Sequence, residues 1–255
     1  MSEIRGLDNE FEFVKYLNGK KVKELNPLMR EVIDDIYNNI DEESIIKCWK
    51  NHFKQKSDIF IKINDVMKGI SIKKGMKNSV HVEGISYFRG FLKENNVDNK
   101  IIEEYLKYHF ADGSVDGTGE IRHSVIEYKQ KNQKNIDKIN DVFNDERIIR
   151  AAIDRFLLKG NNSDYYIEGI ICGEINDFLW INRKDVEQIV LDKRFNYSTS
   201  VHFGPLVCQP KSRCLNYNLL YEKDRYCVQI KWYSLFDDII ENMNNKIKKS
   251  RLSLW

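Results

Sequence analysis

The stretch KSDIFIKI (residues 56–63), followed by GISIKKG (residues 69–75), constrains the fold more than any other part of the chain. Each segment is rich in isoleucine and alternates in polarity, which predicts two β-strands joined by a short polar turn. Side chains on a strand point alternately to its two faces, so the isoleucines of both strands share one face. The opposite face then holds Asp58 and Lys73, which places a carboxylate and an amine on the same side of a hairpin.

The composition is that of an ordinary globular protein. The 255 residues are 42% hydrophobic and 31% charged, and the 3 prolines and the lack of a Ser/Gly tract argue against a long linker. The formal net charge of +2 does not exclude a nucleic-acid partner, because a local basic cleft is sufficient for binding. The chain is therefore expected to form a single domain over residues 1–255.

The cysteines and the apolar segments argue against two other classes of protein. The 5 cysteines are odd in number and include no Cys-x-x-Cys pair, so neither a zinc knuckle nor a disulfide framework is indicated. No apolar run approaches the ~20 residues that a membrane span needs. The N-terminus lacks the apolar core of a signal peptide. These features predict a reduced, cytoplasmic protein with no membrane partner.

Periodicity predicts helices and strands in alternation around the hairpin. Asn26 followed by Pro27 is typical of a helix start, and apolar residues at helical spacing predict a second helix from Asp41 through Phe53. Further helices are predicted at residues 82–94, 100–110, 126–143, 144–157, 183–193 and 234–248, and further strands at 165–172, 177–181, 201–209 and 225–232. This pattern indicates an α/β or mixed α+β fold.

The face that holds Asp58 and Lys73 has the groups that phosphodiester hydrolysis requires. A phosphodiester repels nucleophiles by its charge, and a divalent metal overcomes this by binding a phosphate oxygen and activating a water. Asp58 would supply a carboxylate ligand and Ile72 a backbone carbonyl, in keeping with the preference of Mg²⁺ for oxygen. Lys73 would orient the attacking water or stabilise charge on the phosphate. We therefore interpret the hairpin as a candidate nuclease site.

The pattern of Asp58, a hairpin and then x-Ile-Lys73 resembles the motif of the restriction-endonuclease-like, or PD-(D/E)xK, nucleases. The resemblance implies a central mixed β-sheet flanked by helices. It also implies a catalytic core at residues 26–110, with further sheet, helices and DNA-recognition elements at residues 111–255. Ser57 stands where the motif often has Pro, and Ser71 stands where it usually has Asp or Glu.

Ser71 makes the motif incomplete, because serine is a poor ligand for Mg²⁺. Some restriction enzymes of this superfamily also have Ser at this position and take the missing carboxylate from the following helix. By that resemblance Ser71 belongs to the catalytic set, and Glu83 is the candidate for the relocated acid. Glu31, on the first long predicted helix, is a second acidic candidate of the kind that some members use.

The resemblance also implies an activity and its partners. The chain is expected to be a Mg²⁺-dependent type II restriction endonuclease, with Mn²⁺ as a substitute metal. Its substrate would be double-stranded DNA, and a homodimer would match the two-fold axis of a palindromic site. A DNA methyltransferase of the same system would be a functional partner.

Side chains suited to phosphates and base edges occur in two regions of the sequence. The candidates near the motif are Lys74, Lys77 and His81, and those in the second half are Arg122, Gln209, Lys211, Arg213 and Asn216.

Other functions fit the same sequence. A repair, recombination or mobile-element nuclease would share the core, whereas a non-catalytic DNA-binding protein would keep the fold without the acid that Ser71 replaces. An Asp and a Lys on one strand face are also commonly a solvated surface pair, as expected of an interaction protein with no nucleic-acid role.

Overall fold

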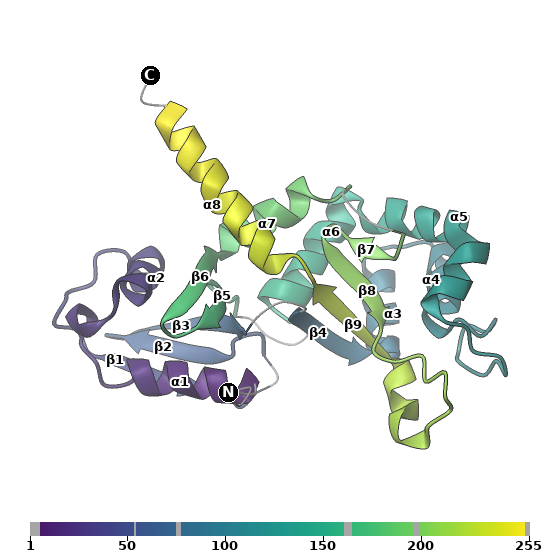
Figure 1. Ribbon diagram of the computed structural model, residues 1–255, viewed down its shortest axis with the longest axis horizontal. Coiled ribbons are helices and arrows are strands. Elements are labelled where there is room, and N and C mark those ends of the chain that lie inside the picture. The colour runs from purple at the N-terminus through teal and green to yellow at the C-terminus, as the bar shows by residue number, and fades with distance from the viewer. Residues whose placement is uncertain (1–5, 54, 75–77, 161–164, 196–198, 253–255) are drawn as a thin grey trace. The chain divides into compact units, whose positions relative to one another are not determined.

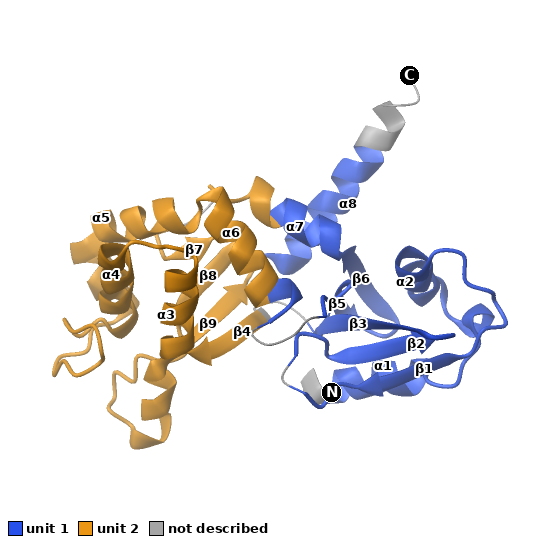
Figure 2. Ribbon diagram, turned by 180° about the vertical axis from the view of Figure 1, so that it is seen from behind, with its two compact units in different colours: residues 1–78, 157–189, 234–255 blue, residues 79–156, 190–233 orange. Residues whose placement is uncertain are grey.

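The protein divides into two compact units, each with its own β-sheet. The computed structural model describes residues 6–53, 55–74, 78–160, 165–195 and 199–252. Unit 1 comprises residues 1–78, 157–189 and 234–255, and unit 2 comprises residues 79–156 and 190–233 (Figure 2). The boundary near residue 78 falls inside the predicted core at 26–110, and the expectation of one domain over residues 1–255 stays a prediction.

Unit 1 is built on a five-stranded mixed sheet in the order β1-β2-β3-β5-β6 (Figure 1). Its strands are β1 (Ile46–Lys50), β2 (Ile59–Ile63), β3 (Val66–Lys73), β5 (Gly169–Glu174) and β6 (Asp177–Asn182). β3 and β5 are parallel, and the other neighbouring pairs are antiparallel. The predicted hairpin is therefore present as β2 and β3, and the mixed sheet that the motif implied is confirmed.

The helices of unit 1 flank this sheet. They are α1 (Gly6–Leu17), the short η1 (Val22–Glu24), α2 (Pro27–Tyr37) and α8 (Leu235–Leu252). α2 begins as predicted: Pro27 is its first residue, and the Asn26 side chain accepts a hydrogen bond of 2.8 Å from the backbone N–H of Met29. Two further segments cross the boundary between the units, η2 (Asp154–Leu158) and α7 (Arg183–Asp192).

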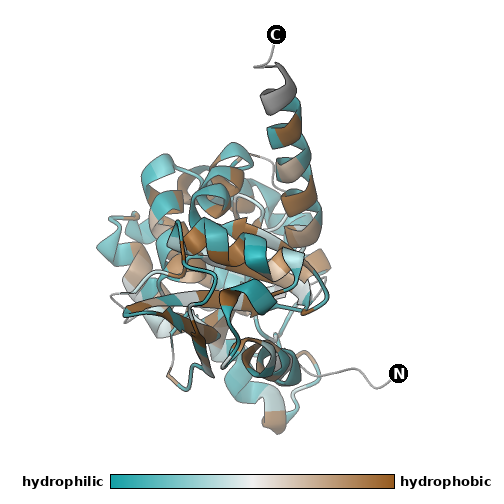
Figure 3. Ribbon diagram, turned by 90° about the vertical axis from the view of Figure 1, so that its left-hand side faces the viewer, coloured by the Kyte–Doolittle hydropathy of each residue, from teal (hydrophilic) through white to brown (hydrophobic). Residues whose placement is uncertain are grey.

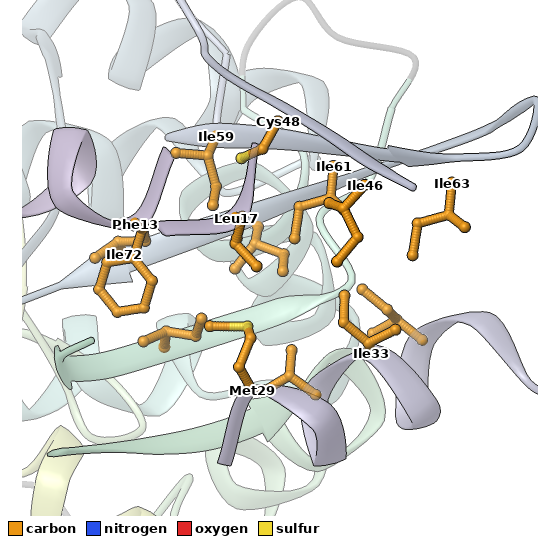
Figure 4. Packing of buried hydrophobic residues seen from close by; sticks show 14 of the residues in the cluster. Phe13, Leu17, Met29, Ile33, Ile46, Cys48, Ile59, Ile61, Ile63 and Ile72 are labelled. Carbon is orange, nitrogen blue, oxygen red and sulfur yellow. The ribbon is translucent and has the colours of Figure 1, made fainter. Parts of the chain in front are cut away.

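The core of unit 1 lies between the hairpin and two helices. Ile59, Ile61 and Ile63 of β2 are fully buried, and they pack with Phe13 of α1 and Met29 of α2 in one apolar cluster (Figure 4). The predicted isoleucine face of the hairpin is therefore the core face. Because side chains alternate along a strand, the face with Asp58 is the other side of the sheet.

Unit 2 joins a four-stranded sheet to a mainly helical layer. Its strands, in the order β4-β9-β8-β7, are β4 (Asn78–Gly84), β9 (Cys227–Trp232), β8 (Leu206–Pro210) and β7 (His202–Phe203). Its helices are α3 (Ile85–Glu94), α4 (Asn99–Phe110), α5 (Val125–Phe143), α6 (Glu146–Ile153) and the short η3 (Leu219–Tyr226). Aromatic rings fill its centre, where Phe143 stacks on Phe203 with ring centroids 4.6 Å apart.

The predicted helix from Asp41 through Phe53 is wrong, because residues Ile46–Lys50 form strand β1. The apolar residues of this segment fit a helical period, but Trp49 is 39% exposed and Phe53 is 78% exposed. The side chains that are buried, Ile46 and Cys48, alternate along the strand. Pairing with β2 therefore overrode the local periodicity.

The predicted start of a helix at Val82 is also wrong. Strand β4 continues to Gly84, and α3 begins at Ile85. β4 pairs with β9, so hydrogen bonding within the sheet of unit 2 outweighed the helical spacing of the apolar residues in this segment. Glu83 consequently lies on a strand and not on a helix.

Candidate active site

Four of the predicted catalytic and metal-binding residues meet at the end of the hairpin in unit 1. Asp58 directly precedes β2, and its Oδ2 accepts hydrogen bonds from Ser71 Oγ at 2.8 Å, from the backbone N–H of Ile72 at 2.6 Å and from Lys73 Nζ at 3.1 Å. The structure thus brings together Asp58, Ser71, Ile72 and Lys73, as the sequence predicted.

Backbone bonds hold Asp58 in place before its strand begins. Its N–H donates to the carbonyl of Ile70 at 2.9 Å, and its carbonyl accepts from the N–H of Asn51, also at 2.9 Å. The Asn51 side chain additionally donates to the carbonyl of Ser57 at 2.8 Å. The carboxylate is therefore fixed by both neighbouring strand segments.

Gly69 lets the chain before Asp58 approach β3 closely. A Cβ at this position would lie 2.1 Å from Ser57 Oγ and 3.2 Å from a ring carbon of Phe60. Ser57 is itself buried, at the position where the nuclease motif often has Pro. The small pair of Ser57 and Gly69 thus sets the spacing between the two strands beside the carboxylate.

The site is partly exposed to solvent, and its three hydrogen bonds to Asp58 use only one of the two carboxylate oxygens. The side chains of Asp58 and Lys73 are 23% and 18% exposed. All three hydrogen bonds meet at Oδ2, so Oδ1 takes part in none of them. Lys73 Nζ also donates to the carbonyl of Ile72 at 3.2 Å, and the amine therefore contacts both groups that were predicted to bind a metal.

Glu83 lies in unit 2, where it forms a largely buried ion pair. Arg155, on η2, donates to Oε2 of Glu83 at 2.8 Å and to Oε1 at 3.3 Å, and His81 Nε2 is 3.5 Å from Oε2. Burial alone would raise the pKa of Glu83, but the bonds from His81 and Arg155 outweigh it and hold the pKa below its ordinary value. The role of Glu83 as a metal ligand stays a prediction, and Arg155 is a partner that the sequence did not indicate.

Glu31 and the lysines after the motif occupy different settings. Glu31 is on the exposed side of α2, whose other side is buried and which packs against the edge strand β6. Lys74 Nζ is 3.4 Å from a carboxylate oxygen of Glu174, and Lys77 lies outside the described residues. Among the described residues, no group of three or more His, Cys, Asp and Glu side chains could hold a metal ion.

Four of the predicted DNA contacts line one pocket of unit 2. The pocket has a volume of about 560 Å³, and its lining includes Gln209, Lys211, Arg213 and Asn216. Arg213 is buried, and its Nη2 donates to the carbonyl of Tyr108 at 2.7 Å. The four side chains are close in sequence, so their proximity was expected. Ser124 and Tyr221 also line the pocket, which the sequence did not indicate.

Arg122 is engaged inside unit 2. Its guanidinium forms two bonds with Glu222, at 2.8 and 2.9 Å, and a third with the carbonyl of Cys214 at 2.7 Å. The side chain is 11% exposed. These contacts give Arg122 a role in holding η3 to the loop before α5.

The fold is similar to that of a restriction endonuclease. The crystal structure of restriction endonuclease MspI in complex with its cognate DNA aligns with 91% of this chain and 93% of that chain, with a TM-score of 0.58 and 14% sequence identity. No family model matches the sequence, and no curated protein matches it. None of the helices in the described ranges is long and apolar enough to cross a membrane. The similarity to the restriction endonuclease and the mixed sheet flanked by helices confirm the fold class that the motif implied.

Proposed function

We propose that this protein is a Mg²⁺-dependent deoxyribonuclease that cleaves double-stranded DNA at specific sequences, as a type II restriction endonuclease does. The proposal is supported by the meeting of Ser71, Ile72 and Lys73 at one oxygen of Asp58, within a fold similar to that of a restriction endonuclease. An ordinary solvated pair of Asp and Lys does not require three donors from three consecutive residues.

The groups around Asp58 suit a hard divalent cation. The carboxylate of Asp58 is partly exposed and the carbonyl of Ile72 lies beside it, and both are oxygen ligands of the kind that Mg²⁺ prefers. When bound, the metal would polarise the phosphate and lower the pKa of a coordinated water. Mn²⁺ is expected to substitute, because it accepts the same ligands.

The residues of the chain have distinct roles in this proposal. Lys73 contacts both Asp58 and Ile72, so its ammonium group would stabilise the negative charge that develops on a phosphate bound there. Ser71 is a positioning residue, because its hydroxyl holds the carboxylate of Asp58. Glu83 and Glu31 remain the two proposed sources of a second carboxylate, and Glu83 would have to exchange its pairing with Arg155.

The proposed DNA contacts divide into phosphate and base contacts. Lys74, Lys77 and His81 are proposed to contact phosphates, since basic side chains next to a cleavage site fix the backbone. The pocket lined by Gln209, Lys211, Arg213 and Asn216 presents amide and basic groups, which are suited to base edges. Arg122 is proposed as a DNA contact as well, although its pairing with Glu222 leaves little of its guanidinium available.

Incubating purified protein with plasmid and Mg²⁺ tests the proposal. Discrete fragments are expected, and a smear would favour the repair or mobile-element nuclease. Lys73→Ala should abolish cleavage while DNA binding is largely kept. Lys62→Ala is the matched control, because Lys62 lies on the same face of the hairpin and forms its own ion pair with Asp65. Cleavage by Lys73→Ala at the wild-type rate would contradict the site.

A non-catalytic DNA-binding protein is the second candidate function. It is favoured by Ser71, whose hydroxyl occupies the position where the motif usually has an acid. This alternative predicts that the wild-type protein shifts DNA in a gel at all Mg²⁺ and Mn²⁺ concentrations without cutting it. The interaction protein with no nucleic-acid role would neither shift nor cut DNA.

A homodimer and a methyltransferase complete the proposal. One active site per chain requires two chains to cut both strands at once, and a two-fold dimer matches a palindromic sequence. A DNA methyltransferase of the same system would protect the host sequence as a functional partner. Methylation of the plasmid at the cleaved sequence should then block cutting.

A further inference from the structure

The buried side chains of the C-terminal helix α8 lie in its first turns, where the helix packs in unit 1. Leu235, Asp238 and Ile239 are buried, and Ser234 Oγ donates to Asp238 Oδ2 at 2.8 Å. From Ile240 to Lys248 every residue is exposed except Asn242, which is half-buried. An α-helix of 18 residues is about 27 Å long. The side chains of residues 240–248 are therefore mostly exposed to solvent.

The exposed part of α8 has an apolar stripe along one side. Phe236, Ile240, Met243 and Ile247 are 40%, 37%, 42% and 50% exposed, and they follow one another at spacings of four, three and four residues. This spacing is that of the a and d positions of a coiled coil. Figure 3 shows hydrophobic stretches of the ribbon, in brown, alternating with hydrophilic ones along the helix below the C-terminus. These four residues form a stripe, or seam, of the kind through which one helix of a coiled coil packs against another.

A partner for this seam would contribute to the stability of α8. Most helical stability in proteins comes from packing of the apolar face and not from the intrinsic propensity of the helix. Each exposed apolar side chain that a partner covers adds roughly 25 cal/mol per Å² of buried apolar area. Within the exposed part of α8, Lys246 forms an ion pair with Asp185 of α7.

The charges of α8 are separated along its length. Its first half exposes Asp237 and Glu241, and its second half exposes Lys246 and Lys248. These charges complement the dipole of α8 itself. They also mean that two α8 helices in parallel would place like charges together, whereas two in antiparallel orientation would place acidic halves beside basic halves.

We propose that a second copy of this chain docks on α8, through antiparallel pairing of the two helices. A two-fold axis between Ile240 and Met243 places Ile240 of one copy against Met243 of the other, and Phe236 against Ile247. The stripe is thus self-complementary about one axis, as a two-fold interface requires. This pairing deepens the proposed function by naming a surface for the homodimer, and it is measured without DNA, so either proposal can fail while the other stands.

Sedimentation of the full chain, without DNA, tests the pairing. The wild-type protein is expected to form a dimer whose fraction rises with concentration. Ile240→Asp and Met243→Asp should each weaken the dimer by about 100-fold, because an unpaired carboxylate would be buried in the seam. Asn245→Asp is the matched control, since it adds the same charge on the opposite side of α8 and should leave the dimer unchanged. Circular dichroism of each variant checks that the fold is kept.

The orientation is tested by disulfide trapping. A mixture of Phe236→Cys and Ile247→Cys should form a mixed disulfide, whereas each variant alone should not form its own. Efficient self-crosslinking of Phe236→Cys would show parallel helices and overturn the orientation. A wild-type protein that stays monomeric at all concentrations, or a dimer that Ile240→Asp and Met243→Asp leave intact, would overturn the surface itself.

Discussion

Two carboxylates, Asp58 in unit 1 and Glu83 in unit 2, are each bonded to a cation but in contrasting ways. Lys73 and two other donors reach Asp58 at a single oxygen, and the Asp58 side chain keeps 23% exposure. Arg155 bonds both oxygens of Glu83, whose side chain is 3% exposed. A lysine ammonium is a point charge on a flexible stem, whereas an arginine fork satisfies a carboxylate from two sides. Asp58 thus keeps a partly exposed side chain with its three hydrogen bonds on one oxygen, whereas Glu83 is bonded through both oxygens inside unit 2.

The largest effect expected from this comparison is on activity at Asp58. Asp58→Asn keeps the shape of the side chain but removes its charge, so both the proposed metal ligand and the partner of Lys73 are lost. Cleavage should fall by about a hundred- to a thousand-fold, the size expected when a group that stabilises charge in the transition state is removed. Initial rates on plasmid with Mg²⁺ measure this, and melting curves should show that the variant remains folded. An active Asp58→Asn would place the chemistry elsewhere.

A large effect on stability is expected at the second carboxylate. Arg155→Met removes the guanidinium that bonds both oxygens of the buried Glu83, and breaking such a pair costs about 3 kcal/mol. Urea unfolding should therefore show a clear loss for Arg155→Met. Adding Glu83→Gln to this variant should restore part of the loss, because no buried charge then remains. Equal and additive losses in the double variant would show that the two side chains do not interact.

The same pair predicts a dependence of stability on pH. Because the pKa of Glu83 is lower in the folded protein than its ordinary 4.5, its pairing stabilises the fold fully above that pH. The contribution is lost as the pH falls below 4.5 through the folded pKa. The unfolding free energy of the wild-type protein should thus decrease more steeply in acid than that of Glu83→Gln. Parallel decreases for the two proteins would contradict the assigned pairing.

The smallest effect is expected at Glu31, on the exposed side of α2. We predict that Glu83→Gln weakens metal-dependent cleavage far more than Glu31→Gln does, with Mg²⁺ titrations of the two variants as the measurement. Stability should be unchanged in Glu31→Gln, since its side chain is exposed. A reversed order of activity would assign the second carboxylate to α2.

Local patterns predicted the elements whose stabilising contacts lie close together in sequence. The start of α2 depends on Asn26 and Pro27, which act within one helical turn. The hairpin of β2 and β3 has Asn64 in the left-handed region, with φ of 52°, which suits its tight turn. Residues 46–50 and 82–84 were predicted wrongly because their apolar residues also match a helical period, whereas pairing of β1 with β2 and of β4 with β9 selected the extended form.

The sequence by itself determined that Asp58, Ser71 and Lys73 would share a face of one hairpin, since strand alternation and a short turn act over a few residues. Only the tertiary structure decided how each acid is used. Arg155 follows Glu83 by 72 positions, and no local periodicity predicts a contact between residues so far apart in sequence. The same holds for the bonds that converge on Oδ2 of Asp58, because their geometry depends on how closely Gly69 allows Ser57 to approach. Burial and pairing are properties of the packed chain, and they distinguish the partly exposed carboxylate of Asp58 from the buried, ion-paired carboxylate of Glu83.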